Sequence, residues 1–384
     1  MDYENLHAKY KAEKLHGRYV TAADITPLLL HHNSNKQLRE IGRSVLGKPI
    51  YSFELGSGKT KILLWSQMHG NESTTTKALM DLLNFLNGNT QMAKELLSHF
   101  TILAIPMLNP DGAQAYTREN ANGVDLNRDA VQLTQPESRI LKHTYDTFNP
   151  DLCFNLHDQR TIFAVANTRL PATISFLAAS YNESRDVNEI RRKAMAVIVA
   201  MNTVLQQYIP GQVGRFDDSF NINCIGDRLH SLGMPTILVE AGHFQNDYNR
   251  EISRKYVFIA LLSALKAIYE NVIVDIESDD YMNIPQNNPC LFDFVYKNIK
   301  INYDNSEIIT NFAAQYKEEL INNKIFFNAF IVKIGDLEQN HGHVEYDANG
   351  ALYADSQDGI PRLNKKADFS LGKNVKVVNG LIKF

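Results

Sequence analysis

The stretch "KILLWSQMHGNESTTTKALMDLLNFLNG", residues 61–88, changes part-way from one kind of pattern to another. Residues 61–68 form a short apolar run of the length expected for a buried strand, and residues 73–88 carry leucines at helical spacing. Ser73 is a candidate N-cap for this helix. Two polar residues, His69 and Glu72, therefore lie where a strand is expected to give way to a helix.

The same alternation continues through the first 270 residues. Further strands are predicted at 100–108, 151–157 and 236–242. Helical patterns follow them at 138–148, 188–208 and 249–272. This alternation of strands and helices predicts an α/β fold with a mixed, mostly parallel sheet and helices on both faces.

The character of the chain changes near residue 276. Residues 276–289 are acidic and then rich in Asn and Pro, which is typical of a linker. Residues 290–384 alternate aromatic and β-branched residues between Gly and Asn-Gly turns, with one helix-like piece at 306–321. We therefore expect a first domain over 1–275, a linker over 276–289 and a small β-rich domain over 290–384.

Composition excludes several classes of protein. The 384 residues include 39 basic and 43 acidic side chains, a net charge of −4 that does not favour nucleic acid or a membrane surface. Three scattered cysteines are too few for a disulfide framework. The first twenty residues lack the apolar core of a secretory signal, and we see no run of the ~18 apolar residues that a membrane span needs. We expect a cytoplasmic protein.

Polar side chains follow several of the predicted strands. They are His69, Glu72, Arg118, Asp125, Asn127, Arg128, His157 and Glu240. The carboxyl ends of strands in an α/β sheet form the ligand-binding edge, so these groups should converge. Two histidines and one carboxylate that leave a coordination position open are typical of catalytic zinc. Glu240 follows a buried strand, where an ionised carboxylate is costly unless it is paired.

Three of these residues also have a plain structural interpretation. Asp125 fits a turn cap, and Asn127 with Arg128 fits a solvated turn. The whole set of motifs, however, resembles the M14 family of zinc carboxypeptidases. The motifs are "GRSVLGKPI" (42–50), "HGNE" (69–72), "NPDG" (109–112), "NGVDLNR" (122–128), "FNLHD" (154–158) and "LVEAG" (238–242). The resemblance covers residues 42 to 245 and does not extend to the tail.

The resemblance implies a metal centre with one Zn²⁺ ion. His69, Glu72 and His157 would hold the ion. Asp125 would hydrogen-bond the far nitrogen of a ligand histidine, expected to be His69, and so fix its tautomer.

It also implies roles in catalysis and in substrate binding for the remaining residues. Glu240 would be the general base that takes a proton from the attacking water, and Arg118 would stabilise the oxyanion. Asn127 and Arg128 would bind the terminal carboxylate of a peptide substrate. The implied activity is hydrolysis of the C-terminal amide bond.

The match departs from the family at two points. Digestive members carry a substrate-covering tyrosine between the second zinc histidine and the general base, and residues 213–239 contain none. Asn71 stands where those members have arginine, and Asp227 is a candidate selector for a basic terminal residue. A zinc deacylase that resembles aspartoacylase and succinylglutamate desuccinylase is the alternative. The β-rich tail favours it, whereas the spacing of "NGVDLNR" favours the peptidase.

Overall fold

The computed structural model describes residues 1–32, 37–274, 276–303, 306–356 and 359–383. The chain divides into two compact units. The first comprises Met1–Arg160 and Ala172–Asn287, and the second comprises Thr161–Pro171 and Asn288–Phe384. Residues 276–289, expected as a linker, contain helix α10 (Ser278–Met282) and the short strand β10 (Asn287–Asn288).

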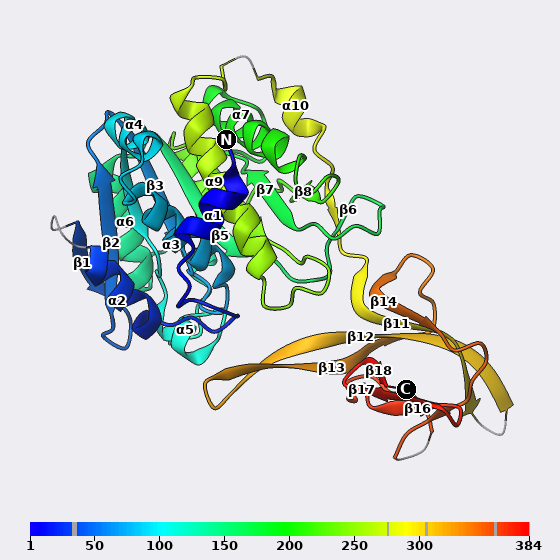
Figure 1. The fold of residues 1–384 in the computed structure, drawn as a ribbon. Coiled ribbons are helices and arrows are strands. Elements are labelled where there is room, and N and C mark those ends of the chain that lie inside the picture. The colour runs from blue at the N-terminus through cyan, green and yellow to red at the C-terminus, as the bar shows by residue number, and fades with distance from the viewer. Residues whose placement is uncertain (33–36, 275, 304–305, 357–358, 384) are drawn as a thin grey trace. The chain divides into compact units, whose positions relative to one another are not determined.

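An eight-stranded sheet in the order β1-β2-β4-β3-β5-β9-β7-β8 forms the centre of the first unit (Figure 1). The strands are β1 (Leu38–Arg43), β2 (Pro49–Gly56), β3 (Thr60–Ser66), β4 (Phe100–Ile105), β5 (Leu152–Asp158), β7 (Ile174–Ala178), β8 (Val213–Arg215) and β9 (Thr236–Ala241). The central pairs β4–β3, β3–β5 and β5–β9 are parallel, and so is β7–β8. The remaining pairs are antiparallel.

Helices cover both faces of this sheet (Figure 1). They are α1 (Tyr3–Tyr10), α2 (Ala22–His32), α3 (Thr74–Leu86), α4 (Gln91–His99), α5 (Pro110–Ala115), the 3₁₀ turn η1 (Leu126–Arg128), α6 (Pro136–Phe148), α7 (Glu189–Leu205), α8 (Ile225–Ser231) and α9 (Glu251–Tyr269). The larger core lies under α3, α7 and α9, and a smaller one lies under α6 and α8. The expected mixed α/β fold with helices on both faces is confirmed.

The start of α3 is capped from a distant part of the chain. Ser73 occupies the N-cap position, but its hydroxyl donates to the Arg18 carbonyl at 2.6 Å instead of capping the helix. The carboxylate of Asp158 accepts from the N–H groups of Thr74 and Thr75, at 3.0 and 3.2 Å. An acidic group at a helix N-terminus satisfies free N–H groups and complements the helix dipole.

The second unit is rich in β-structure, as expected. One sheet runs β13-β12-β11-β14 and another runs β15-β16-β17-β18. Their strands are β11 (Leu291–Tyr303), β12 (Ser306–Ile321), β13 (Lys324–Ile334), β14 (His341–Asp347), β15 (Tyr353–Ala354), β16 (Phe369–Leu371), β17 (Val375–Val378) and β18 (Leu381–Lys383). The helix-like interpretation of 306–321 was wrong, because this segment is β12 and pairs with strands on both sides.

Residues 161–171 belong to the second unit although they follow β5. The Leu291 N–H donates to the Ile162 carbonyl at 3.0 Å, and His343 Nε2 lies 2.8 Å from the Thr161 carbonyl oxygen. This segment carries β6 (Ala164–Val165), which pairs with β10.

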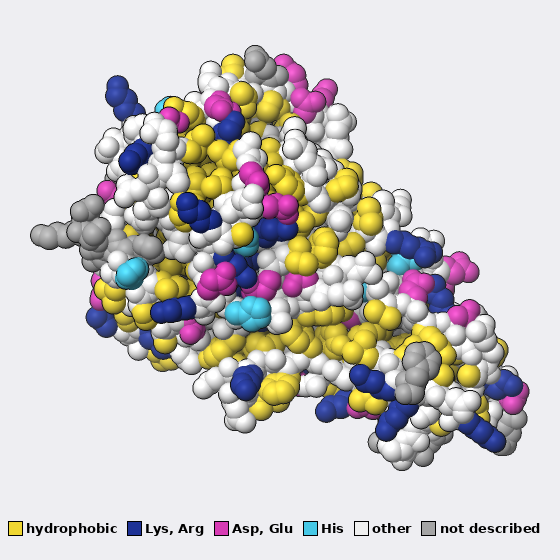
Figure 2. Space-filling model, viewed as in Figure 1, with side chains coloured by type: hydrophobic (Ala, Val, Ile, Leu, Met, Phe, Trp, Pro, Cys, Tyr) yellow, Lys and Arg dark blue, Asp and Glu magenta, His cyan; other side chains and the backbone are white. Residues whose placement is uncertain are grey.

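Charged side chains are interspersed over the face drawn in Figure 2 and form no large patch of one sign. In the described ranges, no helix is both long and apolar enough to cross a membrane.

Candidate metal centre

The turn that carries the first two predicted ligands packs tightly against α5. β3 ends shortly before this turn, which leads through His69 and Glu72 into α3. A Cβ atom on Gly70 would lie 1.9 Å from the carbonyl carbon of Gly112. Only glycine permits such an approach. The "HGNE" and "NPDG" motifs therefore pack against each other through their backbones.

Three side chains, two from the turn after β3 and one from the end of β5, meet in one buried cluster. His69 Nδ1 lies 2.9 Å from Glu72 Oε1, and His157 Nδ1 lies 2.8 Å from Glu72 Oε2. The two Nδ1 atoms face each other at 3.0 Å. One ligand atom from each residue lies within 4.8 Å of the others, and among the described residues this is the cluster that could hold a metal ion. The structure thus brings the three predicted ligands to one point.

The donor set fits a divalent cation. Two imidazole nitrogens at 3.0 Å can share only one proton, whereas a cation between them accepts both lone pairs. Burial lowers the pKa of His157. Burial alone would raise the pKa of Glu72, but His69 and His157 outweigh it and hold that pKa well below its ordinary value. The carboxylate and His157 are therefore in the deprotonated forms that metals bind.

Asp125 contacts the outer ring nitrogen of His69, one of the predicted ligands. Its Oδ1 atom lies 2.9 Å from His69 Nε2 and accepts from the Asn127 N–H at 2.8 Å. Its Oδ2 atom accepts from Arg118 Nε at 3.1 Å, and Arg118 Nη1 donates to Glu72 Oε1, also at 3.1 Å. Asp125 therefore caps the η1 turn and contacts the predicted ligand His69 at the same time. The two interpretations that the sequence left open are compatible.

Glu240 lies beside the cluster on the next strand. β9 is parallel to β5, and Glu240 is the register partner of His157. Its side chain is half-buried, and its Oε2 atom has no hydrogen-bond partner among the described residues. Burial and the charges of Glu72 and Asp158 raise the pKa of Glu240 well above its ordinary value, although two arginines oppose them. A carboxyl group with these properties is suited to accept a proton near neutral pH.

Asn127 and Arg128 lie on the η1 turn but have other partners. Asn127 Oδ1 accepts a hydrogen bond from the Ile225 N–H at the start of α8, at 3.0 Å. Arg128 is exposed, and its Nη1 donates to the Asn127 carbonyl at 2.7 Å. The guanidinium is thus open to solvent, where an anion can approach it.

Asp227 is buried in α8, in the same region. Its Oδ2 atom accepts from the Asn221 N–H at 3.3 Å. Burial raises the pKa of Asp227 to about 7, although the Asn221 N–H opposes the shift. The carboxyl group therefore changes charge around neutral pH.

One residue of the centre had no assigned role in the sequence interpretation. Asp158 directly follows the predicted ligand His157, and its N–H donates to Glu72 Oε2 at 3.1 Å. Its carboxylate caps α3 and lies 3.2 Å from Arg18 Nη1. An acid directly after a predicted ligand, at the end of a buried strand, was the signal available in the sequence.

The family model described as zinc carboxypeptidase, Peptidase_M14, matches residues 27–159. This segment includes all three residues of the buried cluster. The expected resemblance to the M14 family of zinc carboxypeptidases is confirmed over this segment, which is about a third of the chain. One zinc ion is the cofactor that this match indicates, and the cluster has the donors to bind it.

Curated relatives match the chain over part of their length. Probable carboxypeptidase 2 of Arthroderma benhamiae is 33% identical over 102 residues, which cover 27% of this chain and 19% of that protein. Carboxypeptidase E of Caenorhabditis elegans is 32% identical over 119 residues, which cover 25% of each. The chain thus matches a quarter or less of the length of these two relatives.

Solved structures share the fold of the chain over about two thirds of its length. The metallo-carboxypeptidase of Burkholderia cenocepacia has a TM-score of 0.54 at 19% identity, with 66% of this chain and 70% of that one covered. Thrombin activatable fibrinolysis inhibitor has a TM-score of 0.51 at 15% identity, with 71% and 81% covered. At these identities the likeness concerns the fold.

Proposed function

We propose that this chain is a zinc-dependent carboxypeptidase that hydrolyses the C-terminal amide bond of a peptide. The pairing of His157 with Glu240 carries the proposal. It places the Glu240 carboxylate beside a buried cluster with zinc-binding donors. Within the described part of the chain, the Oε2 atom of this carboxylate has no hydrogen-bond partner. Amide hydrolysis needs an activated water, a base and a charge that stabilises the oxyanion.

His69, Glu72 and His157 would hold a zinc ion, which would act as a Lewis acid, polarise a carbonyl and lower the pKa of a water towards ~7. Glu240 handles the proton. Its carboxylate accepts a proton from the water as the water oxygen bonds to the carbonyl carbon, and then gives it to the leaving nitrogen as the C–N bond breaks. The products are the shortened peptide and a free amino acid.

Arg118 is the proposed oxyanion group. Two of its five N–H donors are held by Asp125 and Glu72, which fixes the orientation of the guanidinium plane. Arg128, with the amide of Asn127, is proposed to bind the terminal carboxylate, because an exposed guanidinium can bind a carboxylate with two parallel hydrogen bonds.

Matched pairs of peptides test this function. Each pair ends in a free carboxylate or in an amide, and release of the terminal residue is measured for the wild type and for Arg128→Ala. We expect the wild type to prefer free acids, and Arg128→Ala to raise KM for them by about 10-fold or more, since hydrogen bonds between charged groups are lost. Arg139→Ala, which removes another exposed arginine bound to backbone carbonyls, should leave KM unchanged. Equal cleavage of acids and amides would contradict the carboxypeptidase proposal.

The same assay distinguishes the alternative function. N-acyl amino acids are added to the panel, because a zinc deacylase would hydrolyse them and leave peptides intact. Peptides that end in Lys, Arg or Leu test whether Asp227 selects a basic side chain. If it does, the preference should weaken below about pH 7, where Asp227 becomes neutral.

A further inference from the structure

Residues 11–21 form an irregular segment between α1 and α2, here called the N-terminal strap. Side chains of α3 and α9 bind its backbone. The Ala12 N–H donates to Asp81 Oδ1 at 2.7 Å, and Arg254 donates to the carbonyls of Ala12 and Leu15 at 3.0 and 2.7 Å. Arg254 and Asp81 are themselves paired and fully buried.

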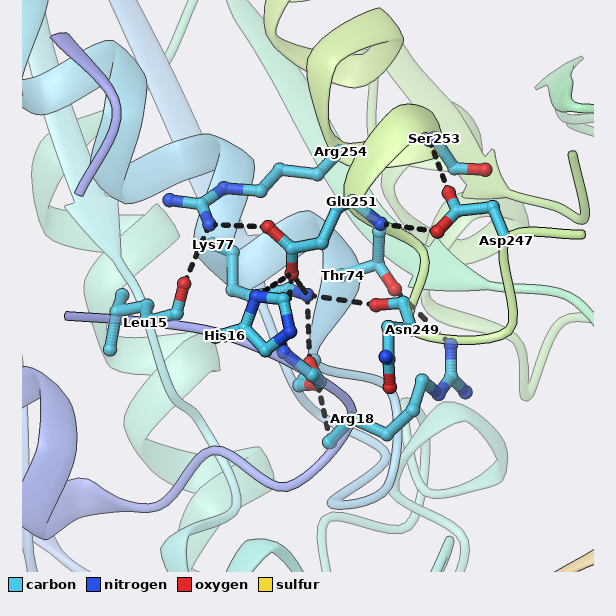
Figure 3. A network of polar contacts seen from close by, with 12 residues as sticks. Leu15, His16, Arg18, Thr74, Lys77, Asp247, Asn249, Glu251, Ser253 and Arg254 are labelled. Atoms are coloured by element: carbon cyan, nitrogen blue, oxygen red, sulfur yellow. Dashed lines mark hydrogen bonds and ion pairs between the residues drawn. The ribbon is translucent and has the colours of Figure 1, made fainter. Parts of the chain in front are cut away.

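The middle of the strap is held around Glu251 (Figure 3). The Gly17 N–H donates to Glu251 Oε1 at 3.2 Å, and Lys77 Nζ donates to the Gly17 carbonyl at 2.7 Å. Lys77 is completely buried and also pairs with Glu251 at 2.6 Å. Because buried charges are tolerated only when they are paired and hydrogen-bonded, this network fixes the path of the strap.

The second half of the strap reaches the turn that carries the metal ligands. Ser73 Oγ donates to the Arg18 carbonyl at 2.6 Å. Gln67 Nε2 donates to the carbonyls of Val20 and Gly70, both at 2.8 Å. Gln67 itself has a left-handed backbone, with φ 47°, and is buried. The strap is therefore hydrogen-bonded on both sides of the ligand turn, to Gln67 before it and to Ser73 after it.

The side chain of Arg18 contacts Asp158, the residue next to His157. It is 7% exposed, and its Nη1 atom lies 3.2 Å from Asp158 Oδ2 and 3.2 Å from Thr74 Oγ1. Asp158 is the neighbour of ligand His157 in the chain, and its N–H donates to the second ligand, Glu72. The guanidinium group of Arg18 thus binds Asp158, which is joined to His157 by the backbone and to Glu72 by a hydrogen bond.

We propose that Arg18 is a positioning residue of the zinc site, which acts through Asp158 on Glu72 and on the backbone that carries His157. Loss of Arg18 would leave the buried Asp158 carboxylate without its cation, and the carboxylate would move or draw in water to regain a partner. Glu72 and His157 would then be held less rigidly. The strap precedes the segment matched by the family model. This inference rests on the proposed zinc site but not on the nature of the substrate.

Zinc affinity measured by competition with a chelator tests the proposal on the full chain. We expect Arg18→Met to bind zinc about 10-fold more weakly, as is usual when a group that orients metal ligands is lost. The absorption bands of the Co²⁺-substituted protein should shift as well. Arg18→Lys keeps a cation beside Asp158 and should recover part of the affinity. Arg191→Met is the matched control, because Arg191 is fully buried and pairs with Asp218, outside the ligand turn. It should lower stability without changing zinc affinity.

Wild-type zinc affinity and an unchanged Co²⁺ spectrum in folded Arg18→Met would overturn the proposal. If Arg18→Met does not fold, Arg18→Gln decides, because its amide keeps an N–H donor in the side chain but removes the cation beside Asp158. A weaker affinity then supports the proposal and an unchanged affinity overturns it. A wild type that binds zinc but cleaves no peptide would contradict the proposed function and leave this assignment standing.

Discussion

His157 and Glu240 are register partners on the neighbouring parallel strands β5 and β9. Adjacent strands lie about 4.8 Å apart, and side chains at paired positions point to the same face of the sheet. A predicted zinc ligand and a predicted general base are therefore held at a fixed separation by the backbone of two central strands. No loop movement is needed to bring them together.

The first prediction concerns Glu240→Gln. We expect this variant to bind zinc like the wild type and to lose turnover by about 10²–10⁴-fold, because the amide keeps the shape of the side chain but cannot accept a proton. Metal content and kcat are measured on the same preparation. His157→Ala is the comparison, since it should lose the metal as well as the activity. Retained turnover in Glu240→Gln would remove the general-base assignment.

The second prediction concerns Asp125→Asn. Burial raises the pKa of Asp125, but the hydrogen bond and charge of His69 outweigh it and bring the pKa well below its ordinary value. The carboxylate is thus ionised at working pH, and its replacement should weaken zinc binding by about 10–100-fold. Asp129→Asn is the control, because the Asp129 carboxylate accepts hydrogen bonds from the N–H groups of Thr134 and Gln135 and not from a predicted metal ligand. It should leave zinc affinity intact, and equal losses in both variants would mean that the effect is not specific.

The third prediction links Glu251 to acid stability. Burial raises the pKa of this carboxyl, but Lys77 and neighbouring cations lower it to about 2, whereas its unperturbed value is 4.5. A lowered pKa means that Glu251 stabilises the fold above about pH 4.5 and that this contribution is lost as pH falls towards 2. Because the side chain is 17% exposed and solvent screens part of the attraction, we expect about 1–2 kcal/mol.

Denaturant unfolding of Glu251→Gln from pH 7 to pH 2 measures this contribution. The wild type should be more stable at pH 7, and the difference should shrink below pH 4.5. Glu4→Gln breaks the exposed pair with Lys255 and should change stability by less than about 1 kcal/mol at any pH. A difference between wild type and Glu251→Gln that stays constant with pH would contradict the prediction.

The segment 306–321 shows where prediction of secondary structure from a local sequence pattern fails. Phe312, Ala313, Tyr316 and Leu320 recur at helical spacing, yet the segment is the long strand β12. It pairs with β11 over its first half and with β13 over its second half. Hydrogen bonds and packing against two neighbouring strands outweigh intrinsic preference in such a segment, and neither neighbour is visible in a short sequence window.

The amino-acid sequence by itself determined the alternation of strands and helices in the first unit and the residue types of the metal centre. Both are local properties, since apolar periodicity and the polar residue after each strand can be read from neighbouring positions. Tertiary structure alone decided that Asp158 caps α3, that Arg18 reaches Asp158, and that Glu240 stands opposite His157. These relationships join residues far apart in the chain, and they depend on strand order and register, which no single segment encodes.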